Sequence, residues 1–197
     1  LTLTGPFNHP LETDTLPPRL THLTFGDNFN QELKTCNLPV DLTDLAFGIR
    51  FDQTLRGNEL PPNLTSLEFG MFASTPFGDG VLPRTLTRVI MGMHTERLFS
   101  PGVLPPDLRC LTMPWDFNES LRSDMLPAGL RKLTFGHTFN QEVGVGVLPN
   151  TITHLNCEEN FNQPLGVGVL PTELTHLTFG WNFNQPLLIG VLPPGLL

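Results

Sequence analysis

The strongest constraint on this chain is a dipeptide that recurs at a constant interval. Leu-Pro appears every 22 residues, with no insertion or deletion between occurrences. Its leucines are Leu16, Leu38, Leu60, Leu82, Leu104, Leu126, Leu148, Leu170 and Leu192. A fixed period of this length is typical of repeat proteins, in which each unit buries its apolar side chains against its neighbours. The interval predicts one repeat domain over residues 1–197, with eight full repeats and partial repeats at 1–15 and 192–197.

The repeats share the frame L-P-x-x-L-T-x-L-x-F-G-x-x-F-N-Q-x-L-x-x-G-V. Its L-x-F segment alternates apolar and free positions, which predicts a short strand with one buried face. Proline at the second position, in a unit of only 22 residues, leaves little room for a helix of normal length. We therefore expect the strands of successive repeats to form a parallel sheet. The rest of each repeat should be extended or single-turn backbone, with few or no long helices.

Phenylalanine usage supports the same frame. The chain has 15 Phe and no Tyr, an unusual aromatic choice for a surface. A first Phe column contains Phe25, Phe47, Phe69, Phe135 and Phe179, and a second contains Phe7, Phe29, Phe51, Phe117, Phe139, Phe161 and Phe183. A buried Tyr would need a partner for its hydroxyl, whereas Phe does not. The two columns predict a continuous dry spine along the solenoid.

The second Phe column is interrupted in the middle repeats. Ala73 and Thr95 take the Phe position there, while Phe77 and Phe99 enlarge the leucine position four residues later. Close packing favours such a compensation of volume. Alternatively, Phe72 shifts by one position and fills the gap left by Ala73. The sequence leaves both arrangements open.

The motif F-G-x-x-F-N-Q at residues 25–31, 135–141 and 179–185 resembles the FNIP repeat family of leucine-rich-repeat solenoids. The resemblance implies a horseshoe or arc with a parallel sheet on its concave side. It also implies protein binding, sometimes behind an F-box that recruits ubiquitin ligase machinery, although these residues contain no F-box-like helical segment. Residues 73–75 and 95–97 depart from the motif, which places regular curvature in doubt there.

Two polar columns of the frame have a structural interpretation. An Asn side chain at a bend can bond the main chain of its own repeat and the next, so the Asn column predicts a ladder that holds the repeats in register. This column contains Asn8, Asn30, Asp52, Asn118, Asn140, Asn162 and Asn184. The glycines that follow the strands predict a tight turn or positive φ. They are Gly26, Gly48, Gly70, Gly92, Gly136 and Gly180.

Positions that the frame leaves free are the candidates for function. Two outward columns flank the buried strand leucine and vary in charge and size, as expected of a recognition face. An exposed apolar cluster in repeats two to five often marks a binding site, and Trp and Met are favoured at interfaces. The alternative is partial burial of this cluster under an irregular turn. The predicted partner-binding residues are Ile49, Met71, Phe72, Arg88, Ile90, Met93, Trp115, His154 and His176.

His154 and His176 occupy one column in adjacent repeats, about one strand spacing apart. A metal site would need further ligands, and only Cys157, Glu158 and Glu159 are near in sequence. A stacked or hydrogen-bonded surface pair is therefore the favoured interpretation. No metal or other cofactor is expected.

Catalytic motifs are absent from the sequence. It contains no G-x-S-x-G, H-E-x-x-H, P-loop or C-x-x-C pattern, so we do not expect an enzyme. Cys110 near Arg88 and Lys132 is a weak alternative nucleophile, because neighbouring cations lower a thiol pKa. A Thr column, Thr21, Thr43, Thr65, Thr87, Thr153 and Thr175, raises ice or carbohydrate binding as another weak alternative. Threonine is also simply a good strand residue.

Charge and cysteine content narrow the partners. A net charge of −8 with scattered basic residues argues against nucleic acid, and no membrane span or signal peptide is visible. Three Cys at unrelated frame positions form no disulfide framework, which favours an intracellular, cytoplasmic location. The chain starts and stops within repeats without polar caps, which predicts either a fragment or a homo-oligomer joined through its ends. The expected function is a scaffold that binds a protein partner, and the alternative is a self-assembling structural solenoid.

Overall fold

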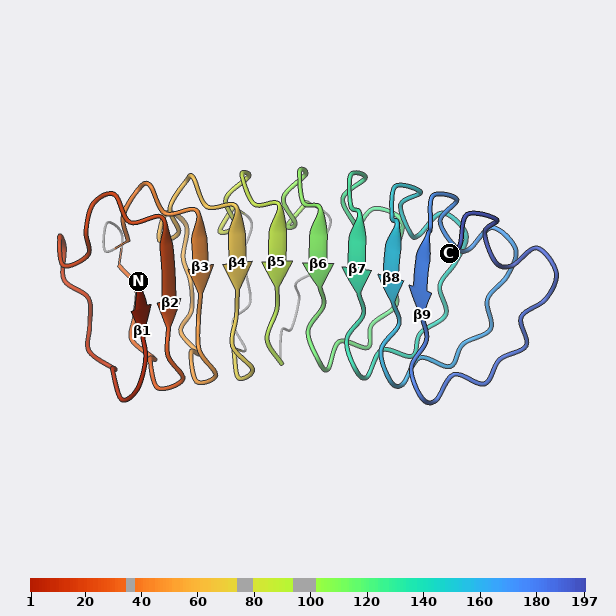
Figure 1. Cartoon of the computed structure of the whole chain (residues 1–197), viewed down its shortest axis with the longest axis horizontal. Coiled ribbons are helices and arrows are strands. Elements are labelled where there is room, and N and C mark those ends of the chain that lie inside the picture. Colours follow the sequence, from red (N-terminus) through yellow and green to blue (C-terminus); the bar gives the residue numbers. More distant parts are fainter. Residues whose placement is uncertain (35–37, 74–79, 94–101) are drawn as a thin grey trace.

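The chain folds into an arc-shaped solenoid in which every turn contributes one short strand to a single sheet (Figure 1). The computed structural model describes residues 1–34, 38–73, 80–93 and 102–197. The nine strands are all parallel and lie in sequence order, β1 to β9. The predicted leucine-rich-repeat-like solenoid is thereby confirmed. The predictions for Cys36, Phe77, Thr95 and Phe99 lie outside the described residues.

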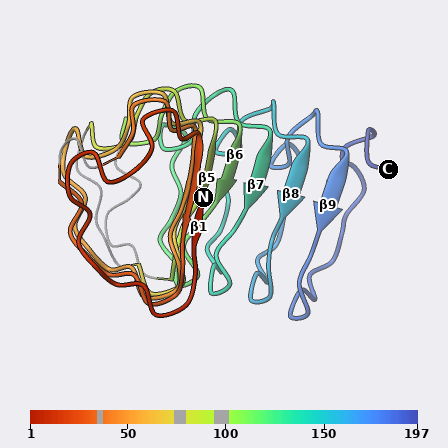
Figure 2. The ribbon, with the colours of Figure 1, turned by 60° about the vertical axis from the view of Figure 1, so that its left-hand side comes forward.

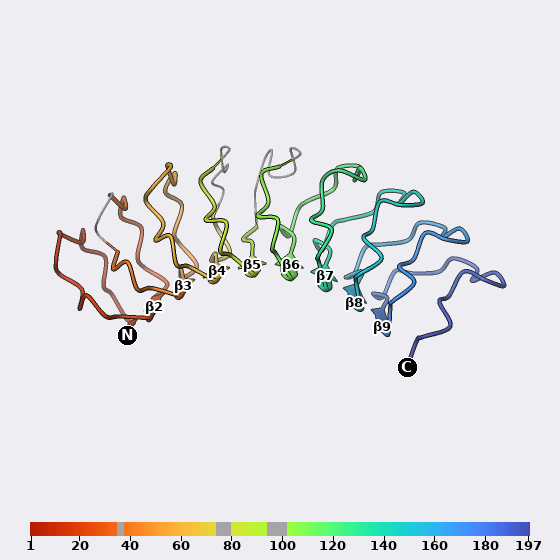
Figure 3. The same ribbon diagram turned by 90° about the horizontal axis from the view of Figure 1, so that it is seen from above.

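The strands are β1 (Thr2–Leu3), β2 (His22–Phe25), β3 (Asp44–Ala46), β4 (Ser66–Glu68), β5 (Arg88–Ile90), β6 (Cys110–Thr112), β7 (Lys132–Thr134), β8 (His154–Asn156) and β9 (His176–Thr178). Paired residues differ by one repeat length, so Leu23 lies opposite Leu45 and Leu45 opposite Leu67. The strands follow the inner edge of the arc, and extended chain and turns form the outer side (Figure 3). No helix occurs in the described parts of the chain, as predicted.

Two stacks of phenylalanine rings form the interior spine. Phe29 and Phe51 lie parallel with centroids 6.1 Å apart, and Phe47 stacks on Phe51 from the other column at 3.8 Å. The strand leucines, such as Leu45, complete the core between the sheet and the outer chain. Figure 2 shows the coils stacked one behind another, with the strands on one side of them. The predicted dry spine is confirmed in the described repeats.

Ala73 keeps the register of the second Phe column. Its side chain is buried, whereas the Phe72 side chain is 48% exposed. The Ala73 N–H donates to the Gly70 carbonyl at 3.2 Å, the same turn that Phe29 makes with Gly26. The turn geometry therefore places Ala73 inside and Phe72 outside. The alternative in which Phe72 shifts inward is wrong.

The Asn column forms the predicted ladder. The Oδ1 atom of Asn140 accepts the main-chain N–H of Asn162 at 2.9 Å and the side-chain amide of Gln163 at 3.0 Å. The same two bonds recur at Asn8, Asn30, Asn118 and Asn162. Each oxygen thus joins two donors of the following repeat. The contribution of the Gln column was not predicted, although Gln follows Asn in the sequence frame.

The glycines after the strands begin a tight turn, as predicted, since the Phe29 N–H donates to the Gly26 carbonyl at 3.1 Å. None of the six glycines after the strands has a positive φ, so that alternative is wrong. Positive φ occurs instead in another glycine column, which includes Gly146. The requirement for glycine is instead steric. A Cβ at Gly70 would lie 1.8 Å from the carbonyl oxygen of Gly48 in the preceding repeat.

Candidate partner-binding surface

The concave face presents the two outward columns that the sequence predicted. In β2, for example, His22 and Thr24 are exposed on either side of the buried Leu23. The outward positions of β5 to β9, all of them described, carry no Asp or Glu. They are Arg88, Ile90, Cys110, Thr112, Lys132, Thr134, His154, Asn156, His176 and Thr178. Among the outward strand positions that the structure describes, only Asp44 on β3 and Glu68 on β4 are acidic.

An open hollow of about 270 Å³ lies at the edge of the sheet where the strands end. Met71, Met93 and Trp115 line it from the turns that follow β4, β5 and β6. The remaining lining residues are Phe69, Met91, Gly92, Thr112, Met113, Thr134, Phe135, Gly136, His137 and Glu158. Buried Phe and Met side chains form its base, while Met71 and Trp115 are each 48% exposed. The hollow is therefore apolar, rich in thioethers and open to solvent.

Ring stacking and hydrogen bonds hold the walls of this hollow. The Trp115 indole stacks on the His137 ring with centroids 4.1 Å apart, and His137 Nδ1 lies 3.6 Å from a Glu159 carboxylate oxygen. The Met93 N–H donates to the Met71 carbonyl at 2.6 Å. These contacts fix the turns that carry Trp115, Met93 and Met71. The walls of the hollow are thus held by contacts within the chain.

Three of the six predicted apolar residues come together in this hollow. Met71, Met93 and Trp115 line it, whereas Ile49 and Phe72 are exposed but lie outside its lining. Ile90 faces the sheet surface instead. Met71, Phe72 and Trp115 are each 48% exposed, so about half of each side chain is accessible to solvent and half is buried.

Sequence reasoning missed His137 and Glu158 as residues of this site. Glu158 sits at φ 52° and accepts a hydrogen bond from Asn156 Nδ2 at 2.7 Å. A signal for the hollow was present, since Met91 and Met113 replace the first-column Phe in two consecutive repeats. Flexible, polarisable thioethers in place of a stacked ring indicate an adaptable wall.

A second concavity of about 210 Å³ lies on the sheet beside the hollow. Arg88 and Lys132 flank it, on the strands either side of Cys110. Thr112 and Thr134 line both concavities, so the two adjoin one another, and together they are called the groove below. Among the residues that the structure describes, neither Arg88 nor Lys132 has a carboxylate within ion-pair distance.

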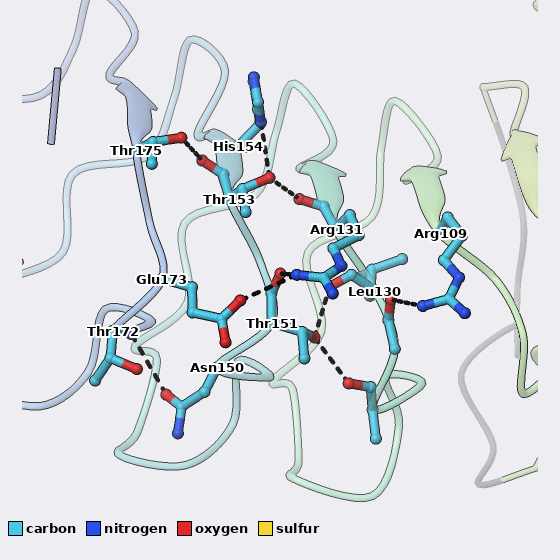
Figure 4. A network of polar contacts seen from close by, with 12 residues as sticks. Arg109, Leu130, Arg131, Asn150, Thr151, Thr153, His154, Thr172, Glu173 and Thr175 are labelled. Atoms are coloured by element: carbon cyan, nitrogen blue, oxygen red, sulfur yellow. Dashed lines mark hydrogen bonds and ion pairs between the residues drawn. The ribbon is translucent and has the colours of Figure 1, made fainter. Parts of the chain in front are cut away.

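His154 and His176 stack on one another as predicted, with centroids 4.2 Å apart and planes 4° from parallel. Each Nδ1 lies 2.9 Å from the hydroxyl of the preceding threonine, Thr153 or Thr175, as Figure 4 shows for His154. Partial burial lowers the pKa of His154, and the charges of His176 and Lys132 lower it further. Protonation of His154 is therefore disfavoured.

The described residues contain no group of three or more His, Cys, Asp or Glu side chains placed to hold a metal ion. Cys157, the nearest cysteine to the His pair in sequence, is buried in the core at the first-column Phe position of its repeat. Burial raises the pKa of its thiol to about 12, with a further contribution from Glu158. Its environment is that of a core side chain and not of a metal ligand.

The Thr column bonds repeat to repeat. Thr65 Oγ1 donates to the Thr43 carbonyl at 3.1 Å, and Thr175 Oγ1 to the Thr153 carbonyl at 3.0 Å. An ion pair between Arg131 and Glu173, at 3.0 Å, spans two repeats beside this ladder (Figure 4). The threonine hydroxyls therefore already serve as donors within the fold.

The one-strand coils, the parallel concave sheet and the inter-repeat ladders define a leucine-rich-repeat-like solenoid, a scaffold class of protein. The FNIP Repeat family model matches residues 7–50, 29–72, 51–94, 117–156 and 161–197. The chain belongs to the FNIP repeat family. Residues 95–116, which include Trp115, lie outside the matched segments.

A solved structure, titled "The crystal structure of CroV588 a novel circular LRR protein structure", is similar to this chain at 42% sequence identity with a TM-score of 0.92. The match covers 99% of this chain and 29% of the other, so the chain spans less than a third of that protein's length. No curated protein matches the chain. The described residues include no helix of the length and apolarity needed to span a bilayer.

Proposed function

We propose that this chain is an interaction scaffold that binds a protein partner through its concave strand face and the adjoining hollow. The observation that carries the proposal is the preformed hollow, in which Met71, Met93 and Trp115 present apolar surface to solvent. Exposed apolar surface of this kind is characteristic of interaction sites, and Trp is enriched among the residues that dominate binding energy. Its thioethers allow the wall to adapt to a partner side chain.

Two further observations support partner binding over the alternatives. The outward columns of the sheet vary from strand to strand, which suits recognition of an irregular protein surface and not of a regular lattice. The hydroxyls of Thr65 and Thr175 donate to neighbouring carbonyls and are committed to the fold, which disfavours ice or carbohydrate binding through that column. Solenoids typically present such extended concave surfaces for binding.

The test compares two tryptophans at the same position of the frame. Trp115 lines the hollow, and Trp181, three repeats later, is 93% exposed and lies outside it. The wild-type chain, Trp115→Glu and Trp181→Glu are each used to capture proteins from a lysate of the source cell. A protein retained by wild type and Trp181→Glu but lost from Trp115→Glu supports the proposal. Equal capture by all three excludes the hollow as the binding site.

Sedimentation velocity over a concentration series distinguishes a second copy of the chain from a separate partner. Under the proposal, Trp115→Glu has the same association state as wild type. If wild type self-associates and Trp115→Glu alone is monomeric, the hollow is a self-association surface, and the proposal of a separate partner is wrong.

A further inference from the structure

The groove, which consists of the hollow and the concavity on the sheet, has two chemically different halves. One half is apolar, with Met71, Met93 and Trp115 at its wall. The other half carries Arg88 and Lys132 on β5 and β7. Since the two halves share lining residues, one segment of a partner can occupy both at once.

The sheet half of the groove carries positive charge, although the molecule as a whole is acidic. The whole chain has a net charge of −8, yet none of the outward residues from β5 to β9, all within the described structure, is acidic. Arg88 and Lys132 lie on either side of Cys110 in the sheet register, which separates their backbones by two strand spacings, roughly 10 Å. A carboxylate placed above Cys110 would therefore approach both cations. Charge complementarity favours an acidic occupant over a basic or neutral one.

Acidic residues at both ends of the groove define where that occupant's carboxylate sits. Glu68 on β4 lies beyond Arg88, and Glu158 forms a wall of the hollow. The Glu159 carboxylate lies 3.6 Å from His137, on whose ring Trp115 stacks. A carboxylate in the hollow would meet Glu158, whereas a carboxylate over the sheet meets Arg88 and Lys132. A bound segment therefore has one orientation in the groove, with its apolar side chain at the turns and its carboxylate over the strands.

We infer that the groove binds a linear segment of a partner protein in which a large apolar side chain lies close to an Asp or Glu. This inference rests on the function proposed above and specifies its ligand. The apolar side chain enters the hollow beside Trp115, and the carboxylate lies between Arg88 and Lys132. Trp115 follows Cys110 by five residues, and we expect a similar spacing between the two features of an extended ligand, about four to five residues at ~3.3 Å each.

The probe is a library of random 12-residue peptides displayed on phage and selected on the full chain. The expected result is enrichment of peptides that combine a Phe, Trp, Leu or Met with an Asp or Glu about four residues away. Synthetic versions are then titrated by fluorescence polarisation. Arg88→Glu with Lys132→Glu, and separately Trp115→Ala, should each weaken binding by about tenfold or more.

Matched controls keep the overall charge change and the residue type constant. Arg19→Glu with Arg84→Glu makes the same change of charge at exposed positions outside the groove, and Trp181→Ala removes the other indole. Binding should stay within about twofold of wild type in both controls, because neither Arg19 and Arg84 nor Trp181 line the groove. A peptide with Asp replaced by Lys should recover affinity for the doubly charge-reversed chain.

The outcomes separate this inference from the proposed function. Peptides that depend on Trp115 but contain no acid, or that ignore the reversal at Arg88 and Lys132, overturn the inference and leave the hollow as a binding site. Peptides that ignore Trp115 count against both. A selection that yields no binder also overturns the inference, because the groove then has no measurable affinity for a linear segment, while partner capture still tests the proposed function.

Discussion

Replacing Gly70 by Ala should break the contact between two repeats. The added Cβ would lie 1.8 Å from the carbonyl oxygen of Gly48 and 2.8 Å from the main-chain nitrogen of Ile49. Ordinary van der Waals contact begins at 3.4 Å, so the two turns must separate by about 1.6 Å. Both contacting groups are backbone, and no side-chain rotation relieves the clash.

The cost follows from the contacts that such a separation removes. The Phe72 N–H donates to the Ile49 carbonyl at 2.9 Å, and a displacement of this size breaks the bond. Overpacking costs typically about 1–3 kcal/mol and a lost hydrogen bond about 1 kcal/mol. Gly70→Ala should therefore lower the free energy of unfolding by about 3 kcal/mol. For a domain of this size that corresponds to a Tm lower by roughly 6–12 °C.

Thermal and urea unfolding followed by circular dichroism measure this loss. Gly57→Ala is the matched control, because a Cβ there meets no atom within 4 Å and no positive φ opposes it. Amide exchange provides a local readout, since exchange of the Phe72 N–H should accelerate in Gly70→Ala alone. If Gly70→Ala unfolds within about 1 kcal/mol of Gly57→Ala, glycine is not required by close approach of the repeats, and the steric argument fails.

Three further predictions concern polar and titratable groups. Asn140→Leu should cost about 1–2 kcal/mol in urea unfolding, because the Asn162 N–H loses its acceptor and Gln163 Nε2 keeps only the main-chain carbonyl of residue 140. Asn140→Asp keeps the oxygen and should cost far less, and equal losses would contradict the ladder. His176→Asn should raise the pKa of His154 in an NMR titration, since a repelling charge is removed. Because its folded pKa lies below the unfolded value of 6.5, His154 should weaken the fold as the pH falls below that value. Burial raises the pKa of Cys157 to about 12, so Cys157 should resist iodoacetamide at pH 8 in the native chain while the partly buried Cys110 reacts. Peptide mass mapping measures the modification of each cysteine, and equal modification of the two would contradict this prediction.

The interior could be predicted because a constant repeat length shows which residues lie next to each other in the stacked repeats. Residues one repeat length apart must be neighbours in a stacked solenoid, so a column such as Phe29 and Phe51 becomes a stack of rings without further information. The same reasoning placed Asn140 beside Asn162 and His154 beside His176. Each of these contacts depends only on the frame and on the spacing of parallel strands.

The binding surface could be predicted only in part. Ile49, Met71, Met93 and Trp115 belong to the same turn in four successive repeats, yet Ile49 lies outside the hollow and the other three line it. The difference depends on how each turn is oriented against its neighbours. A frame that treats the turns as equivalent contains no information on that orientation.

The sequence by itself determined the solenoid, the buried columns and the polar ladder, because periodic contacts between neighbouring repeats follow from spacing and residue type. Only the tertiary structure decided which exposed side chains share one surface and why Gly70 must be glycine. Both depend on distances between backbone turns of different repeats, and the direction of each turn is set by packing across the whole arc. For the same reason, the proximity of Trp115 to Arg88 and Lys132 in one groove could not be predicted from the sequence and depends on the tertiary structure.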